Sequence, residues 1–137
     1  MTTKIFVNLP VTDLQKSISF YEGIGYKKNL QFSDETAACI VVTEDIYIML
    51  LTHPKFKQFT PRIVSDAFNY TEVINAMSVD SKDEVDALMD KILANGGSEI
   101  RDPQDYGFMF SRAFGDPDGH IWELFWMDPK AVEGENA

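Results

Sequence analysis

The chain has 137 residues, of which 45% are hydrophobic, so it is long enough to bury one compact core and too short to suggest two independent domains. Its formal net charge of −10, with 12 scattered basic residues, argues against nucleic acid or an anionic membrane as partners, because both attract clustered positive charge. The longest apolar run, residues 46–51, is far shorter than the ~20 residues that cross a bilayer, and no apolar signal run follows Lys4. We therefore expect one soluble, cytoplasmic domain over residues 1–137.

Residues 4–52 predict a β-α-β-β-β module. A strand is expected over residues 4–9, and residues 12–15 (TDLQ) match the capping box that begins a helix. The helix is expected to run to about Glu22, where glycines end it. It has one apolar stripe: Leu14, Ile18 and Tyr21. Three strands follow, separated by short acidic turns: residues 26–33, 36–43 and 45–52.

The single cysteine, Cys39, lies within the second of these three strands. One cysteine cannot form an intrachain disulfide or a multi-cysteine metal site. Because an apolar run surrounds it, we expect a buried thiol that fills the core rather than a nucleophile.

Residues 71–128 repeat the same order of elements. A strand is expected over residues 72–79, and a second capping box at residues 81–84 (SKDE) begins a helix that ends at residues 95–97 (NGG). The helix has a clear apolar stripe: Val85, Leu88, Met89, Ile92 and Leu93. A short strand over residues 98–101 then leads through a loop into a hairpin over residues 108–127.

The remaining segments are a linker and a tail. Residues 53–70 contain two prolines and little apolar periodicity, so we expect a linker with one short helical turn. Residues 130–137 are charged and are expected to fray. The whole chain therefore predicts an α+β fold of two tandem modules, with helices on one face of the sheets and a cleft between the opposite faces.

Glu123 is the one acid in the last apolar strand, and a buried carboxylate needs a partner. If residues 116–119 form a four-residue hairpin loop, Gly115 pairs with His120 and Arg112 lies opposite Glu123. The same register predicts two further pairs on that face: Phe114 with Ile121, and Phe110 with Phe125. We therefore predict that Arg112 neutralises Glu123, either as a plain ion pair or as part of a ligand site.

Several motifs together resemble the vicinal oxygen chelate superfamily, which includes glyoxalase I, extradiol dioxygenases and bleomycin or fosfomycin resistance proteins. They are VTDL at residues 11–14, SFY at 19–21, the Gly96-Gly97 helix stop and DPDGHIWEL at 116–124. Residues 6–11, 31–35 and 120–123 also resemble a single-domain, lactoylglutathione-lyase-related branch. The resemblance spans residues 4–128 and implies a cup-shaped sheet, the glyoxalase/bleomycin resistance/dioxygenase fold, and a homodimer.

Metal-using members of this superfamily hold a divalent ion with four side chains. The resemblance places these positions at Phe6, Met49, Ile74 and Glu123, of which only Glu123 can bind nickel, zinc, manganese or iron. Strand alternation puts His120 on the opposite face from Glu123, although a metal site of Glu123 with His53 or His120 stays open as an alternative. We therefore expect no metal cofactor.

The remaining residues predict an apolar ligand site. The expected ligand-binding residues are Asn8, Phe6, Met49, Phe110, Arg112, Tyr106 and Phe125. The first hypothesis is a metal-independent protein that binds a small organic molecule. The second is a lyase or isomerase of glyoxalase type, or a dioxygenase-related enzyme, with Glu123 as catalytic base; an arginine partner would disfavour that role by lowering a carboxyl pKa. The third is a homodimeric scaffold with a filled cleft.

Overall fold

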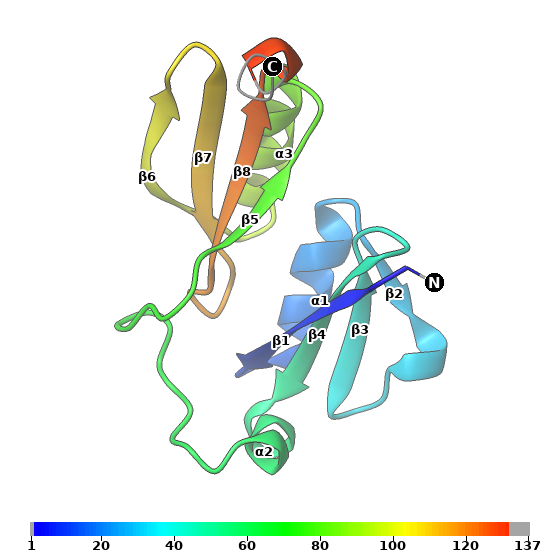
Figure 1. The fold of residues 1–137 in the computed structure, drawn as a ribbon. Coiled ribbons are helices and arrows are strands. Elements are labelled where there is room, and N and C mark those ends of the chain that lie inside the picture. The colour runs from blue at the N-terminus through cyan, green and yellow to red at the C-terminus, as the bar shows by residue number, and fades with distance from the viewer. Residues whose placement is uncertain (1, 132–137) are drawn as a thin grey trace.

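The computed structural model describes residues 2–131; the predicted tail lies outside them from residue 132 onward. Two four-stranded sheets make up the α+β fold, which confirms the predicted fold class (Figure 1). The described residues contain no helix that is long and apolar enough to cross a membrane.

The first sheet has the strand order β1-β4-β3-β2, with β1 parallel to β4 and the other pairs antiparallel. Its strands are β1 (Ile5–Val11), β2 (Lys27–Asn29), β3 (Ala37–Val41) and β4 (Ile46–Thr52). Strand β2 is shorter than predicted, because Leu30–Phe32 forms a 3-10 turn, η1. The Asn29 side chain accepts hydrogen bonds from the backbone amides of Gln31 and Phe32 and thereby turns the chain out of the sheet.

The second sheet repeats this topology with the order β5-β8-β7-β6, and β5 is parallel to β8. Its strands are β5 (Asn75–Ser78), β6 (Ser98–Asp105), β7 (Met109–Gly115) and β8 (Ile121–Met127). Strand β5 is shorter than predicted and β6 is longer, reaching Asp105 with register shifts along its pairing with β7.

Two helices turn the apolar stripes that the sequence predicts toward the core, with the exception of Leu93, which is 44% exposed. They are α1 (Leu14–Gly23) and α3 (Lys82–Ala94). Ser81 caps α3 as predicted, and its hydroxyl accepts from the Glu84 amide at 3.1 Å. The cap of α1 is Asp13 rather than Thr12: the Asp13 carboxylate accepts from the Lys16 amide at 3.1 Å. Thr12 is bonded instead to the second module.

Between the modules the chain forms a short helical segment and then an irregular strap. The helical part consists of α2 (His53–Phe56) and a 3-10 turn, η2 (Lys57–Phe59). Residues 60–74 (the strap) contain no helix or strand and run from η2 to β5 (Figure 1).

The buried side chains of both modules form one core cluster, in which the helix-facing sides of the two sheets pack against α1 and α3. Its largest fully buried members are Trp122, Tyr21, Phe20 and Phe114. Cys39 is buried at 2% exposure, as predicted, and burial raises its thiol pKa. The opposite side of each sheet carries no helix and is the open face.

Polar contacts also connect the modules through the β7–β8 turn. Buried Asp116 accepts from the Tyr21 hydroxyl at 2.7 Å, and that hydroxyl accepts from the Trp122 indole at 3.1 Å. Asp118 accepts from the Thr12 amide and hydroxyl, both at 2.9 Å. Burial raises the pKa of Asp116 above its ordinary value, although the hydrogen bonds from two amides and the Tyr21 hydroxyl act in the opposite direction. The turn motif therefore holds the first module against the second.

Candidate functional site

Strand β8 places Glu123 and Phe125 on the open face of the second sheet. The residues that alternate with them along the strand, Trp122 and Leu124, are buried in the core. This alternation is the one that the sequence predicts.

The predicted register of the β7–β8 hairpin is wrong by one residue. The Asp116 amide donates to the His120 carbonyl at 3.0 Å, so the closing loop has three residues, not four. Ala113 therefore lies opposite Glu123, and Arg112 opposite Leu124. A slip of one residue moves every side chain of a strand to the other face, which is why the predicted Arg112–Glu123 pair does not form.

Two other predicted pairs fail for the same reason. Phe110 lies opposite Trp126, and Phe114 lies opposite Trp122. Phe110 faces the helix side, where the Lys82 ammonium lies 5.9 Å from its ring centroid. It therefore shares no face with Glu123 or Phe125.

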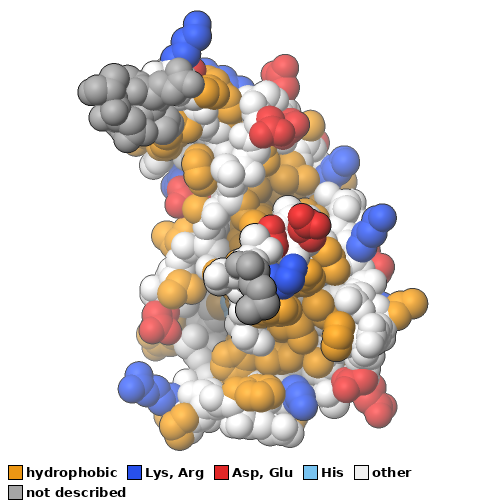
Figure 2. All heavy atoms as spheres, turned by 45° about the vertical axis from the view of Figure 1, so that its right-hand side comes forward, with side chains coloured by type: hydrophobic (Ala, Val, Ile, Leu, Met, Phe, Trp, Pro, Cys, Tyr) orange, Lys and Arg blue, Asp and Glu red, His pale blue; other side chains and the backbone are white. Residues whose placement is uncertain are grey.

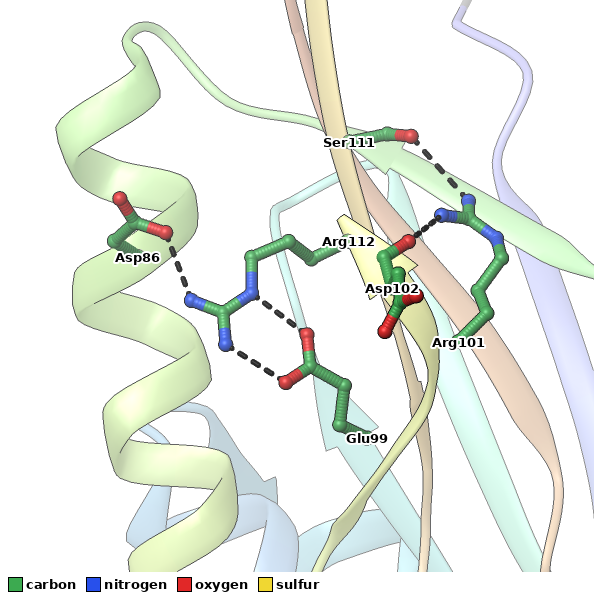
Figure 3. A network of polar contacts seen from close by, with 6 residues as sticks. All are labelled: Asp86, Glu99, Arg101, Asp102, Ser111 and Arg112. Atoms are coloured by element: carbon green, nitrogen blue, oxygen red, sulfur yellow. Dashed lines mark hydrogen bonds and ion pairs between the residues drawn. The ribbon is translucent and has the colours of Figure 1, made fainter. Parts of the chain in front are cut away.

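Arg112 binds two carboxylates on the helix side of the sheet (Figure 3). Its guanidinium makes a bidentate pair with Glu99, at 2.9 and 3.0 Å, and a third hydrogen bond to Asp86 of α3 at 2.8 Å. These bonds lower the pKa of Glu99 and raise that of Arg112. Arg112 is thus a structural residue that fixes α3 to the sheet.

The cation that neutralises Glu123 is Arg101 of β6. Its guanidinium donates to the Glu123 carboxylate oxygen Oε1 and to the Ser111 hydroxyl, the latter at 3.3 Å. Figure 3 shows the Arg101 side chain turned toward Ser111 over the sheet. Ala113 lies between Arg101 and Glu123 in the strand register, and its small side chain leaves room for the guanidinium to cross β7. The sequence predicts an arginine partner for Glu123, but that partner is Arg101 and not the predicted Arg112.

Three predicted ligand-binding residues lie on the open face of the first sheet. The Phe6 ring stacks on Tyr47 with the ring centroids 4.7 Å apart, and Met49 pairs in register with Asn8. The Asn8 amide donates to the Phe6 carbonyl at 3.2 Å. Tyr106 lies in the β6–β7 turn, exposed and tilted against the Phe108 ring. These residues are spread over two sheets and are not gathered at Glu123.

Two cavities among the described residues each have one predicted site residue in their lining. One, of 330 Å³, lies between the strap and the end of β1 and has Asn8 in its lining. The other, of 470 Å³, lies between β1 and β5 and has Phe125 in its lining. The remaining predicted site residues line neither cavity: Glu123, Phe6, Met49, Phe110, Arg112 and Tyr106.

The four positions that the resemblance implies for a metal do not fit one. They offer a phenyl ring, a thioether, an isoleucine side chain and a carboxylate that already pairs with Arg101. His120 cannot assist Glu123, because its Nε2 lies 2.7 Å from the Pro10 carbonyl oxygen on the other side of the strand. Within residues 2–131 no three His, Cys, Asp or Glu side chains lie close enough to hold a metal together.

The two tandem modules and the acid on β8 are features of a known protein family, which comparison with family models identifies. The family model of the Glyoxalase/Bleomycin resistance protein/Dioxygenase superfamily matches residues 5–124, and the chain belongs to this superfamily. No functionally curated protein matches it.

Solved structures with the same fold include the hypothetical protein SA1046 from S. aureus, which is 26% identical with a TM-score of 0.76 over 92% of this chain and 95% of that one. A glyoxalase-related enzyme from Fulvimarina pelagi is 23% identical, with a TM-score of 0.77 over 92% of this chain and 88% of that one. The fosfomycin resistance protein FosX from Mesorhizobium loti is 15% identical, with a TM-score of 0.68 over 97% and 98% of the two chains.

Proposed function

We propose that this protein binds a small organic molecule on the open face of its second sheet without a divalent metal. The observation that carries the proposal is the ion pair of Glu123 with Arg101, because it supplies internally the positive charge that a metal ion would bring. The side chains of this pair are 27% and 31% exposed, so a ligand can reach them.

The geometry suggests how such a ligand would be oriented. Arg101 occupies Oε1 of Glu123, and no described residue donates a hydrogen bond to Oε2. A ligand hydroxyl, amide or amine could donate to Oε2, while its apolar part packs against Phe125 on the same face. The proposal thus requires a ligand with one hydrogen-bond donor and an apolar body.

Metal analysis of the purified protein, combined with thermal unfolding in Ni²⁺, Zn²⁺, Mn²⁺ and Fe²⁺, tests this proposal. We expect substoichiometric metal. The ions should also shift the melting temperatures of Glu123→Gln and of the wild type equally, because an ion bound to the native state at Glu123 would raise only the melting temperature of the wild type. Stoichiometric metal that is lost in Glu123→Gln would overturn the proposal.

A lyase or isomerase of lactoylglutathione lyase type, or a dioxygenase-related enzyme, is the second candidate. The free Oε2 of Glu123 favours it, because a general base needs an accessible oxygen. Against it, a base must gain a proton, and protonated Glu123 would lose its ion pair with Arg101. Turnover of the glutathione hemithioacetal of methylglyoxal, abolished by Glu123→Gln, would establish the enzyme; we expect no turnover above the uncatalysed rate.

We also propose that the protein is a homodimer, because many large apolar side chains are exposed. Six of them lie in and beside the strap: Phe59, Ile63, Phe68, Tyr70, Val73 and Ile74, with Ile63 98% exposed. Figure 2 shows further hydrophobic side chains gathered over the lower part of the molecule, where the first module lies. Light scattering should give twice the 15.5 kDa chain mass. Ile63→Glu should weaken the dimer, whereas Leu93→Glu, at an exposed position of α3, should not.

A further inference from the structure

The 470 Å³ cavity between the two modules has the character of a second ligand site. It lies between β1 and β5, and each of these is an edge strand of its own sheet. Its volume falls within the roughly 300–1,000 Å³ of small-molecule sites. Val7 of β1 and Met77 of β5 form opposite walls, and Leu88 and Trp122 also contribute. Neither Glu123 nor Arg101 lines it.

The lining of this cavity contains no charged residue. An ion would have to leave its water shell for a wall that offers no opposite charge, at a large cost in free energy. The occupant that the cavity favours is therefore neutral and mainly apolar.

One lining hydroxyl lacks a strong hydrogen-bond partner. Among the described residues the half-buried Tyr26 hydroxyl makes a hydrogen bond only to the Met77 sulfur, at 3.8 Å, and a thioether is a weak acceptor. Burial raises the pKa of Tyr26 to about 12, so the hydroxyl keeps its proton at neutral pH. A protonated hydroxyl in an apolar cavity offers a directed donor to a ligand oxygen.

We propose that this cavity binds a neutral organic molecule whose carbonyl oxygen accepts a hydrogen bond from Tyr26. The ligand body would contact Val7 from the first module and Met77 from the second. The site includes neither Glu123 nor Arg101, although Phe125 borders both this cavity and the face at Glu123, and it goes beyond the function proposed for that face.

Acetophenone and ethylbenzene test the proposal, because they have nearly the same shape and differ in a carbonyl against a methylene group. Each is titrated into protein with ¹³C-labelled methionine methyl groups, and the Met77 signal reports on the cavity. We expect acetophenone to bind about three- to tenfold more tightly than ethylbenzene, as one hydrogen bond predicts. In Tyr26→Phe this preference should vanish while ethylbenzene binds as before.

Two further variants locate the site. Ile5 is 56% exposed and lines the cavity, so Ile5→Trp should narrow it and weaken both probes without loss of the fold. Glu123→Gln should change neither affinity. The proposal is overturned if neither probe shifts Met77, if the preference for acetophenone survives in Tyr26→Phe, or if Glu123→Gln weakens binding as much as Ile5→Trp. Metal binding at Glu123 would refute the function proposed above and leave this result untouched.

Discussion

Arg101 and Glu123 form an ion pair that is partly shielded from water, with side-chain exposures of 27% and 31%. We expect a coupling energy of about 1 kcal/mol between Arg101→Met and Glu123→Gln, at the upper end for partly exposed pairs. Urea unfolding of the two single variants and the double variant measures it. Arg101→Met combined with Glu99→Gln is the control, because Glu99 pairs with Arg112 instead, and the two effects should add. Zero coupling in the first cycle would contradict the assigned pair.

Glu99 should make the stability depend on pH. Hydrogen bonds from Arg112 lower its pKa below the ordinary 4.5, so the unfolded chain binds the proton more tightly than the folded chain. The contribution is therefore fully present above pH 4.5 and is lost as the pH falls through the lowered pKa. We expect the wild type to be more stable than Glu99→Gln at pH 7, and the gap in unfolding free energy to narrow below pH 4.5. A gap that stays constant down to pH 3 would contradict this.

At the level of elements, the β7–β8 hairpin shows what the sequence could and could not predict. The two strands, their turn and the alternation along β8 follow from apolar periodicity and the glycine and proline positions. The loop length does not, because it depends on how the Asp116 carboxylate bonds the amides of Asp118 and His120, both at 2.9 Å. The turn therefore sets the β7–β8 register, which places Arg112 on the face opposite to Glu123.

Arg101 was missed for a related reason. The sequence predicts β6 to end there, whereas the strand continues to Asp105 with register shifts on either side of Arg101. Such shifts carry no clear sequence signal, because side-chain fit against β7 sets them. The available signal was an arginine on the edge strand β6, which is two strands away from the lone acid of β8.

Gly119 should be the residue of this turn that tolerates a side chain least. Its φ is +87°, and a Cβ there would lie 2.8 Å from the Phe68 ring and 3.0 Å from the Phe68 amide nitrogen. Gly107 is the matched control, since its φ is +81° but a Cβ would meet nothing within 4 Å. Gly107→Ala should cost about 1 kcal/mol from backbone strain alone. Gly119→Ala should lower the free energy of unfolding, measured in urea, by clearly more than this. Equal losses would mean that Phe68 of the strap moves away from the added Cβ at no cost in free energy.

Over the whole molecule, the duplicated topology was predictable and the arrangement of the modules was not. Each module shows its own strand and helix periodicity, so local patterns were sufficient. The contacts between modules depend on side chains about a hundred residues apart, such as Thr12 with Asp118. The predicted cleft lining fails at this level too: Asn8 and Phe125 line two different cavities.

The hydroxyl of Tyr21 should matter for the whole fold, because it joins α1 of the first module to the turn and β8 of the second. It donates to Asp116 and accepts from Trp122, and all three side chains are buried. Tyr21→Phe leaves a buried carboxylate oxygen and an indole N–H each without this partner, so we expect a loss of about 2–3 kcal/mol in unfolding free energy. Since one core cluster spans both modules, unfolding should remain a single transition.

Tyr26→Phe is the matched control, because it removes a hydroxyl whose one hydrogen bond among the described residues is to a thioether. It should cost about 0.5 kcal/mol or less by the same urea measurement. Hydrogen exchange separates the two explanations of a loss in Tyr21→Phe. If the hydroxyl joins the modules, amides of β1 and of β8 lose protection by the same amount; loss confined to α1 would show that its role is local to the first module.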